Sequence, residues 1–350
     1  MKKILLSLLV IIFWASYALA EKPLFEYGGS TIFLDTTSYQ DQHNYDGNGR
    51  PKELRNLFTE LTRTYLTGYM NFSDDSRIRL TLDSGGYQKD TDGYYKNSYV
   101  FVKYLYWESK NILGFDKLTI GQIETPWIGW EDKIWENRFM AKSVLDAYGI
   151  DNSADRGIMV SSKIGDKVEY AVAVMGGAGY KWPDQDGKWN TEARISYKLA
   201  DGLQASIGGN TGTKLYDQRY SEYYTNKIGM ANLNYKLKPF IVSYTVFGTY
   251  KLDSIIGGVS AQEGETRGKG SSVTAIYNVF GDVDLVGRLD TLDANIETPD
   301  DVRKDSILGA TYKVNDTVKL GLSQQATTQE TGEKMMTVTH VAKFNAQITF

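Results

Sequence analysis

The side chains most suited to catalysis or metal binding are scarce in this chain of 350 residues, which has two histidines and no cysteine. His43 stands between Asp41 and Asp46, a grouping that could offer nitrogen and oxygen ligands to a divalent cation. His340 has no such neighbours, and no Gly-x-Ser-x-Gly nucleophile elbow or Gly-rich phosphate loop is present. We therefore expect no catalytic residue, no metal site and no cofactor, and we interpret His43 as a solvated loop residue.

A denser group of aromatic and charged residues lies between residues 126 and 155. Three tryptophans fall within nine positions there, and the spacing of apolar residues indicates helical turns. Loops this long and this apolar are rarely simple solvent loops, so we expect the segment to pack against other parts of the protein. Its candidate functional residues are Trp127, Trp130, Glu131, Asp132, Trp135, Glu136 and Arg138.

The elements that must position this segment are strands, because apolar and polar residues alternate with a period of two along the chain. Between residues 168 and 174, for example, valine or tyrosine fills every even position. Between residues 193 and 199, every odd position is apolar. Sixteen segments with this character are predicted: 27–37, 55–72, 77–87, 97–107, 116–125, 156–164, 167–177, 191–199, 203–212, 227–237, 239–250, 270–280, 283–294, 304–314, 317–327 and 336–350.

The connections between these segments alternate between short turns and long loops. The short connections are 73–76, 108–115, 165–166, 200–202, 238–239, 281–282 and 315–316, most of them rich in Gly, Asn, Asp or Pro. The long ones are 38–54, 88–96, 126–155, 178–190, 213–226, 251–269, 295–303 and 328–335. A soluble sandwich has no reason to keep all long loops at one end. The pattern predicts an all-β fold: one transmembrane antiparallel barrel of about 16 strands over residues 21–350, with both termini periplasmic.

The first twenty residues are typical of a secretory signal peptide. Lys2 and Lys3 precede an apolar stretch, and Ala18-Leu19-Ala20 is a small-x-small cleavage site. We expect cleavage after Ala20. No later stretch is long and apolar enough for a membrane-spanning helix, so a membrane role would have to use strands. The formal net charge of −4 gives no indication of nucleic-acid binding.

The segment from Met335 to Phe350 is a long alternating strand, well beyond the usual 5–6 or so residues of a globular strand. A two-faced strand that ends in phenylalanine resembles the closing strand of bacterial outer-membrane β-barrels. The resemblance implies that Phe350 is the terminal signal that the barrel-assembly machinery reads. His340 falls on the outward face of this strand, where we expect a lipid boundary or a subunit interface.

A barrel of about 16 strands leaves an aqueous channel lined by the polar face of each strand. A basic wall opposite the acidic segment 126–155 would set a transverse field across the lumen, which screens solutes by charge. The alternative is that these charges are solvated at different heights and share no narrow point. The candidate residues of the basic wall are Arg63, Arg77, Arg79, Lys103, Arg194, Lys198 and Arg288, and the same face assignment also places Lys319 and Lys343 in the lumen.

Three features together are similar to sixteen-stranded bacterial porins, including the phosphate-selective type. They are Gly121-Gln122-x-x-Thr125-Pro126, the aromatic segment that follows, and Ser153-Ala154-Asp155-Arg156-Gly157. The resemblance spans about residues 24–350. It implies that the third external loop folds inward as a constriction and that three copies associate. One departure is the absence of the coiled-coil extension that phosphate-selective relatives often carry before the first strand.

These observations favour a passive outer-membrane porin for small hydrophilic solutes and ions. Two alternatives stay open at this point. One is a pore selective for anions or phosphate. The other is a non-conducting scaffold barrel whose lumen is filled by a periplasmic partner.

Overall fold

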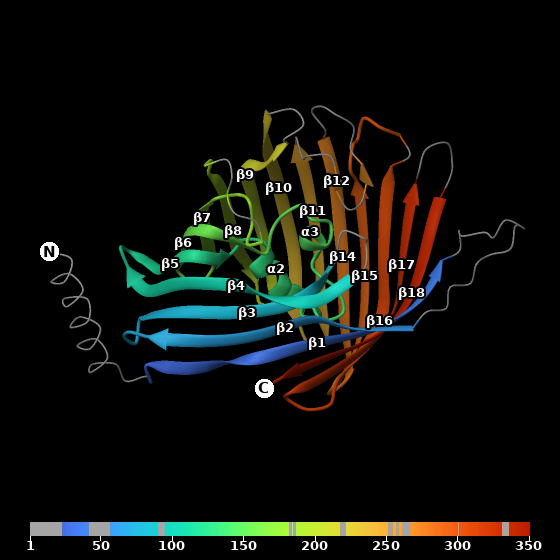
Figure 1. Cartoon of the computed structure of the whole chain (residues 1–350), viewed down its shortest axis with the longest axis horizontal. Coiled ribbons are helices and arrows are strands. Elements are labelled where there is room, and N and C mark those ends of the chain that lie inside the picture. Colours follow the sequence, from blue (N-terminus) through green and yellow to red (C-terminus); the bar gives the residue numbers. More distant parts are fainter. Residues whose placement is uncertain are drawn as a thin grey trace, which may run out of the picture.

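The computed structural model describes residues 23–41, 57–89, 95–181, 184, 187–217, 222–250, 255–256, 259–260, 267–299, 301–330 and 336–350. The leader expected over residues 1–20 lies outside these ranges, as do His43 and Asp46. Within them, sixteen antiparallel strands form one closed barrel in which neighbours in the chain are neighbours in the sheet. Figure 1 shows these strands surrounding two short helices.

The barrel strands correspond one to one with the sixteen predicted segments. They are β1 (Phe25–Asp41), β2 (Leu57–Asn71), β3 (Ser76–Lys89), β4 (Tyr95–Ile112), β5 (Phe115–Glu124), β6 (Ala154–Ile164), β7 (Val168–Met175), β8 (Asn190–Ala200), β9 (Leu203–Asp217), β10 (Glu222–Leu237), β11 (Phe240–Tyr250), β14 (Arg267–Phe280), β15 (Val283–Asp293), β16 (Val302–Lys313), β17 (Val318–Glu330) and β18 (Met336–Thr349). Two further strands, β12 (Ile255–Ile256) and β13 (Val259–Ser260), pair only with each other.

One predicted turn is wrong. The sequence suggested a connection over residues 108–115, but β4 continues to Ile112 and the turn consists of Leu113 and Gly114. Gly114 adopts a positive φ of 81°, which glycine tolerates without strain. Glu108 belongs to the strand because its carboxylate faces Arg77 of the neighbouring strand at 2.5 Å.

The polarity of the two barrel faces is reversed relative to a soluble protein: the outer face is apolar and the inner face is polar. Outward side chains are apolar and exposed, and Leu308 and Leu322 keep 72% and 64% of their surface accessible. Lumen side chains such as Ser196 and Thr311 are polar and buried, at 0% and 1%. This arrangement suits a barrel with lipid outside and polar contents inside. Among the described residues, no helix is long and apolar enough to cross a membrane.

The barrel closes between β1 and β18. Thr31 pairs with Thr349, and the register continues to Asp41 opposite Thr339. At the end of the seam, Ser30 and Phe350 exchange two backbone hydrogen bonds of 2.7 and 3.0 Å. His340 pairs with Ala326 of β17 and has the outward parity of Phe344, as the alternation predicted.

Candidate pore constriction

The segment between β5 and β6 lies inside the barrel. It contains α2 (Ile128–Trp135) and α3 (Val144–Ala147) and ends at Ser153, because Ala154 already belongs to β6. We call residues 126–153 the inner loop. Figure 1 shows both helices enclosed by the strands, so the loop folds inward as the sequence suggested.

The inner loop enters the lumen at Trp127, which is fully buried. Its backbone N–H donates a 2.7 Å hydrogen bond to the Glu192 carboxylate on β8. The carbonyl of Pro126 accepts a 3.0 Å bond from Arg194, whose guanidinium also pairs with Glu169 at 2.6 Å. Arg194 therefore acts as a support behind the inner loop.

An apolar cluster then holds the inner loop against the far wall. Loop residues Trp127, Leu145 and Ile150 pack with strand residues that point into the lumen, including Met230 and Phe247. These apolar strand residues lie where the loop packs on the wall. Burial of apolar surface, at roughly 25 cal/mol per Å² removed from water, favours the folded-in position.

A second group anchors the end of α2. Trp135 packs against Ile276 and Val286 and donates a 2.7 Å hydrogen bond to the carbonyl of Ala141. The guanidinium of Arg288 lies 5.2 Å from the centre of the Trp135 ring and pairs with Asp290 at 2.6 Å. Arg288 is thus also behind the inner loop.

The tip of the inner loop reaches the first strands. Phe139 and Met140 pack with Phe33 of β1 and with Tyr65 of β2. Lys319 of β17 donates a 2.9 Å hydrogen bond to Asn137. The loop therefore contacts the wall from β8 round to β2, and the open space lies along β18 and β1 to β5.

That open space is a cavity of about 450 Å³ between the inner loop and the wall formed by β18 and β1 to β5. Ionisable side chains from both sides line it. They are Arg79, Lys103 and Glu124 from the wall, and Asp132, Lys133, Glu136 and Arg138 from the loop.

Most of these charges are paired. Arg79 lies 3.1 Å from Glu124, and Arg138 lies 2.8 Å from Asp132. Glu136 pairs with Lys236, a β10 residue that sequence reasoning had not singled out. The loop carboxylates therefore do not present the uncompensated acidic face that the composition of the segment suggested.

Lys103 differs from these residues because no carboxylate pairs with it in the described part of the chain. It is 1% exposed and donates a 2.9 Å hydrogen bond to the hydroxyl of Ser153. Its ammonium lies 4.8 Å from the centre of the Tyr180 ring and 5.6 Å from that of Tyr104. Cation–π attraction offsets part of the cost of burying the charge.

Within the inner loop, Arg138 organises two acids. Besides Asp132 it contacts Asp146 at 2.8 Å. Burial alone would raise the pKa of Asp146, but the charges of Arg138 and Lys142 outweigh burial and lower the pKa to about 2. Burial raises the pKa of Asp132. The ion pairs hold the loop in a compact turn.

The structure separates the predicted basic wall into three places. Arg79 and Lys103 line the cavity, and Arg63 pairs with Asp83 at 2.6 Å on the same side. Arg194 and Arg288 lie behind the inner loop. Lys198, bound to Asp201, and Arg77, bound to Glu108, lie near the short turns. The wall is not one surface because period-two alternation gives the face of a residue and not its height.

Glu131, a candidate residue of the constriction, does not line the cavity of about 450 Å³. It is 6% exposed and accepts a 3.0 Å hydrogen bond from Thr245 of β11. Burial raises the pKa of Glu131 to about 8.

No group of three or more His, Asp or Glu side chains in the described ranges is placed to hold a metal ion.

No protein-family model and no curated protein matches the sequence. Solved structures do match. The outer membrane channel DcaP of Acinetobacter baumannii aligns over 95% of this chain and 99% of its own, with a TM-score of 0.65 and 12% identity. The present chain therefore has the fold of the sixteen-stranded outer-membrane porins.

Two further structures support this porin fold. The anion-selective porin from Comamonas acidovorans covers 93% of this chain and 100% of its own, with a TM-score of 0.64 and 10% identity. The trimer form of OmpT from Vibrio cholerae covers 94% and 100%, with a TM-score of 0.60 and 11% identity. At these identities the likeness is one of fold alone.

Proposed function

We propose that the chain forms a water-filled channel in the outer membrane of a Gram-negative-type bacterium. Small hydrophilic solutes and ions diffuse through it passively. The observation that carries this proposal is the cavity of about 450 Å³ beside the inner loop, lined by ion pairs and tyrosines inside a closed barrel. Water and hydrated solutes are stable against such a lining, whereas lipid is not.

The unpaired cations favour a modest preference for anions. Arg79–Glu124 and Arg138–Asp132 are balanced, and Glu136 is balanced by Lys236. Lys103 and Lys133 line the same cavity and have no ion pair within the described ranges. A net positive charge at a narrow point raises the local concentration of anions.

The remaining parts of the proposal concern assembly. We propose that three copies associate, with His340 near a subunit interface, and that both termini are periplasmic. Phe350, whose carbonyl accepts a 2.6 Å hydrogen bond from Tyr27, is proposed as the residue that the barrel-assembly machinery reads. The trimer form of the Vibrio cholerae structure supports the oligomer. No enzymatic role is proposed.

A scaffold barrel around a periplasmic partner is disfavoured, because the inner loop already fills much of the lumen. Recordings from purified protein in planar lipid bilayers separate the two functions. A channel gives stepwise currents, and a reversal potential in a salt gradient on the anion side supports the charge argument. A silent bilayer with correctly folded barrel contradicts the channel, and a cation-selective current contradicts the anion preference.

A further inference from the structure

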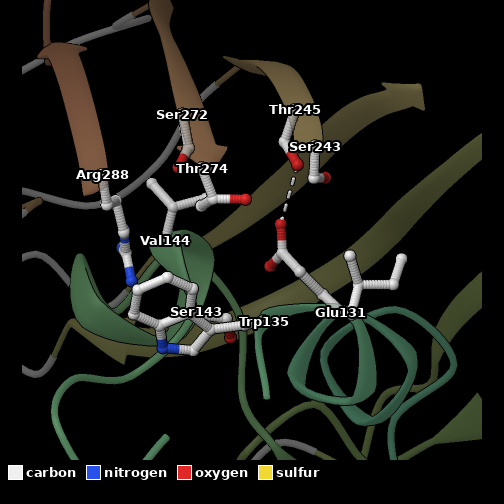
Figure 2. A pocket seen from close by; sticks show the side chains of 10 residues that line it. Glu131, Trp135, Ser143, Val144, Ser243, Thr245, Ser272, Thr274 and Arg288 are labelled. Atoms are coloured by element: carbon white, nitrogen blue, oxygen red, sulfur yellow. Dashed lines mark hydrogen bonds between the residues drawn. The ribbon is translucent and has the colours of Figure 1, made fainter. Parts of the chain in front are cut away.

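A second, much smaller cavity lies between the inner loop and the strands β11, β14 and β15 (Figure 2). Its volume is about 20 Å³, enough for one water molecule. Glu131, Trp135, Ser143 and Val144 enclose it from the loop. The wall side is rich in hydroxyl groups, supplied by Ser243 and Thr245 of β11 and by Ser272 and Thr274 of β14.

Among the described residues, Glu131 is the only carboxyl group lining this small cavity. One carboxyl oxygen accepts the hydrogen bond from Thr245, and the other has no hydrogen-bond partner among the described residues. Figure 2 shows the side chain leaving α2 toward β11. A buried carboxylate with one unpartnered oxygen is unfavourable, whereas a neutral carboxyl can stay there at lower cost.

The surrounding charges do not supply a counter-ion. From β15, Arg288 faces Glu131, but its guanidinium already holds Asp290 with bonds of 2.9 and 2.6 Å and donates to the carbonyl of Lys142. Asp290 and, from the loop, Asp132 bring negative charge toward Glu131. β11 and β14 contribute hydroxyl groups and no charge to the lining.

We propose that Glu131 is a protonation site that latches the inner loop to the barrel wall. The neutral carboxyl holds α2 against β11, and its ionisation draws water into the small cavity and favours a state in which α2 has moved off the wall. This inference deepens the proposed function, because the loop that is latched narrows the channel. It does not depend on conduction, since the movement of α2 has its own readout.

The direction of the pH effect follows from the two states. In the packed loop the pKa of Glu131 is about 8, and in an opened, hydrated loop it returns toward its ordinary 4.5. The packed loop is therefore best held below about pH 4.5. Between the two values the ratio of opened to packed loop rises by up to about tenfold per pH unit, and it levels off above about pH 8.

The absence of cysteine from the natural chain allows a direct test. Val144→Cys places one thiol in the small cavity, and a neutral thiol reagent labels it only when the loop opens. Labelling rates are measured from pH 5 to 9 in detergent, with and without Glu131→Gln. The thiolate fraction changes equally in both proteins. The labelling rate of the protein with Glu131, divided by the rate of the Glu131→Gln variant, therefore reports the effect of Glu131 alone. We expect this ratio to rise by up to tenfold per unit up to about pH 8.

A constant ratio across this range overturns the proposal. Glu136 is a loop carboxylate outside the small cavity, so the Glu136→Gln variant should keep the pH dependence of labelling seen in the parent. A variant that loses this pH dependence would also contradict the assignment to Glu131. If Val144→Cys does not assemble, Ser243→Cys probes the cavity from the wall with a nearly isosteric change. If labelling depends on Glu131 but the purified protein gives no current, the latch proposal is supported and the proposed channel function is contradicted.

Discussion

The backbone N–H of Trp127 and the carboxylate of Glu192 meet at 2.7 Å, although the two residues are 65 positions apart in the chain. Both side chains are fully buried. This contact fixes the point where the inner loop leaves the wall.

Replacing Glu192 with alanine should loosen that point. The Trp127 N–H would lose its acceptor in the interior, which costs about 1–3 kcal/mol. We expect a lower denaturant midpoint in detergent and larger current fluctuations in the open channel. Glu192→Gln keeps an acceptor oxygen and should recover most of the midpoint. Unchanged midpoint and fluctuations in Glu192→Ala would contradict an anchoring role.

Gly208 leaves the space that the Trp127 side chain occupies. A Cβ at this position would lie 2.7 Å from the Trp127 ring and 3.0 Å from the carbonyl of Ala193. Gly208→Ala should therefore displace the indole and destabilise the barrel by about 1–3 kcal/mol, measured by chemical unfolding. Gly229→Ala is the matched control, since a Cβ there meets nothing within 4 Å. Equal effects of the two substitutions would argue against the contact.

Lys103 should contribute more to ion selectivity than other lumen lysines. Lys103→Gln removes the unpaired charge beside the 450 Å³ cavity, so we expect the reversal potential to move toward cations. Lys198→Gln is the control, because Lys198 pairs with Asp201 near a short turn and is far more exposed. If Lys198→Gln shifts the reversal potential as much as Lys103→Gln does, the narrow point lies elsewhere.

Shortening the inner loop should widen the channel. Replacing Trp130–Asp146 with a short Gly-Ser linker removes the side chains that cross to β1, including Phe139 and Met140. Single-channel conductance should rise, and the barrel should be less stable because buried apolar contacts are lost. A conductance equal to that of the parent would show that the loop does not limit flow.

Acid should weaken the inner loop through Asp146. Its pKa is about 2 in the folded protein against an ordinary 3.8, so the folded state favours the ionised form. The resulting stabilisation is present above pH 3.8 and is lost as the pH falls toward 2. It amounts to about 2 kcal/mol at most. Unfolding free energies from pH 5 to 2 should fall more steeply for the parent than for Asp146→Asn, and parallel curves would exclude this contribution.

The alternation of side chains, together with the alternation of short and long connections, predicted the barrel. All sixteen segments are strands, because a closed barrel with an apolar outer face and a polar inner face requires a period of two in each of them. The boundaries were less certain: β4 runs past the predicted turn because Glu108 finds Arg77 across the sheet. The small β12–β13 pair had no comparable pattern and was not predicted.

The site was predicted less completely, for a physical reason. The tryptophans identified the inner loop, but its route across the lumen depends on contacts between residues far apart in the chain. That route turns Arg288 into a support and buries Glu131, although both look like lumen charges in the sequence. Glu192 carried no distinguishing signal, since it alternates on β8 like any other lumen residue.

The seam between β1 and β18 has a consequence for how the molecule is made. Ser30 and Phe350 bond to each other directly, and β1 and β18 join the two edges of the sheet in the closed barrel. A chain interrupted anywhere between them has two open edges, which lipid cannot satisfy. Pairing of β1 with β18 therefore satisfies the last exposed backbone groups of the sheet, and a barrel that lacks this seam carries unpaired groups that are costly in lipid.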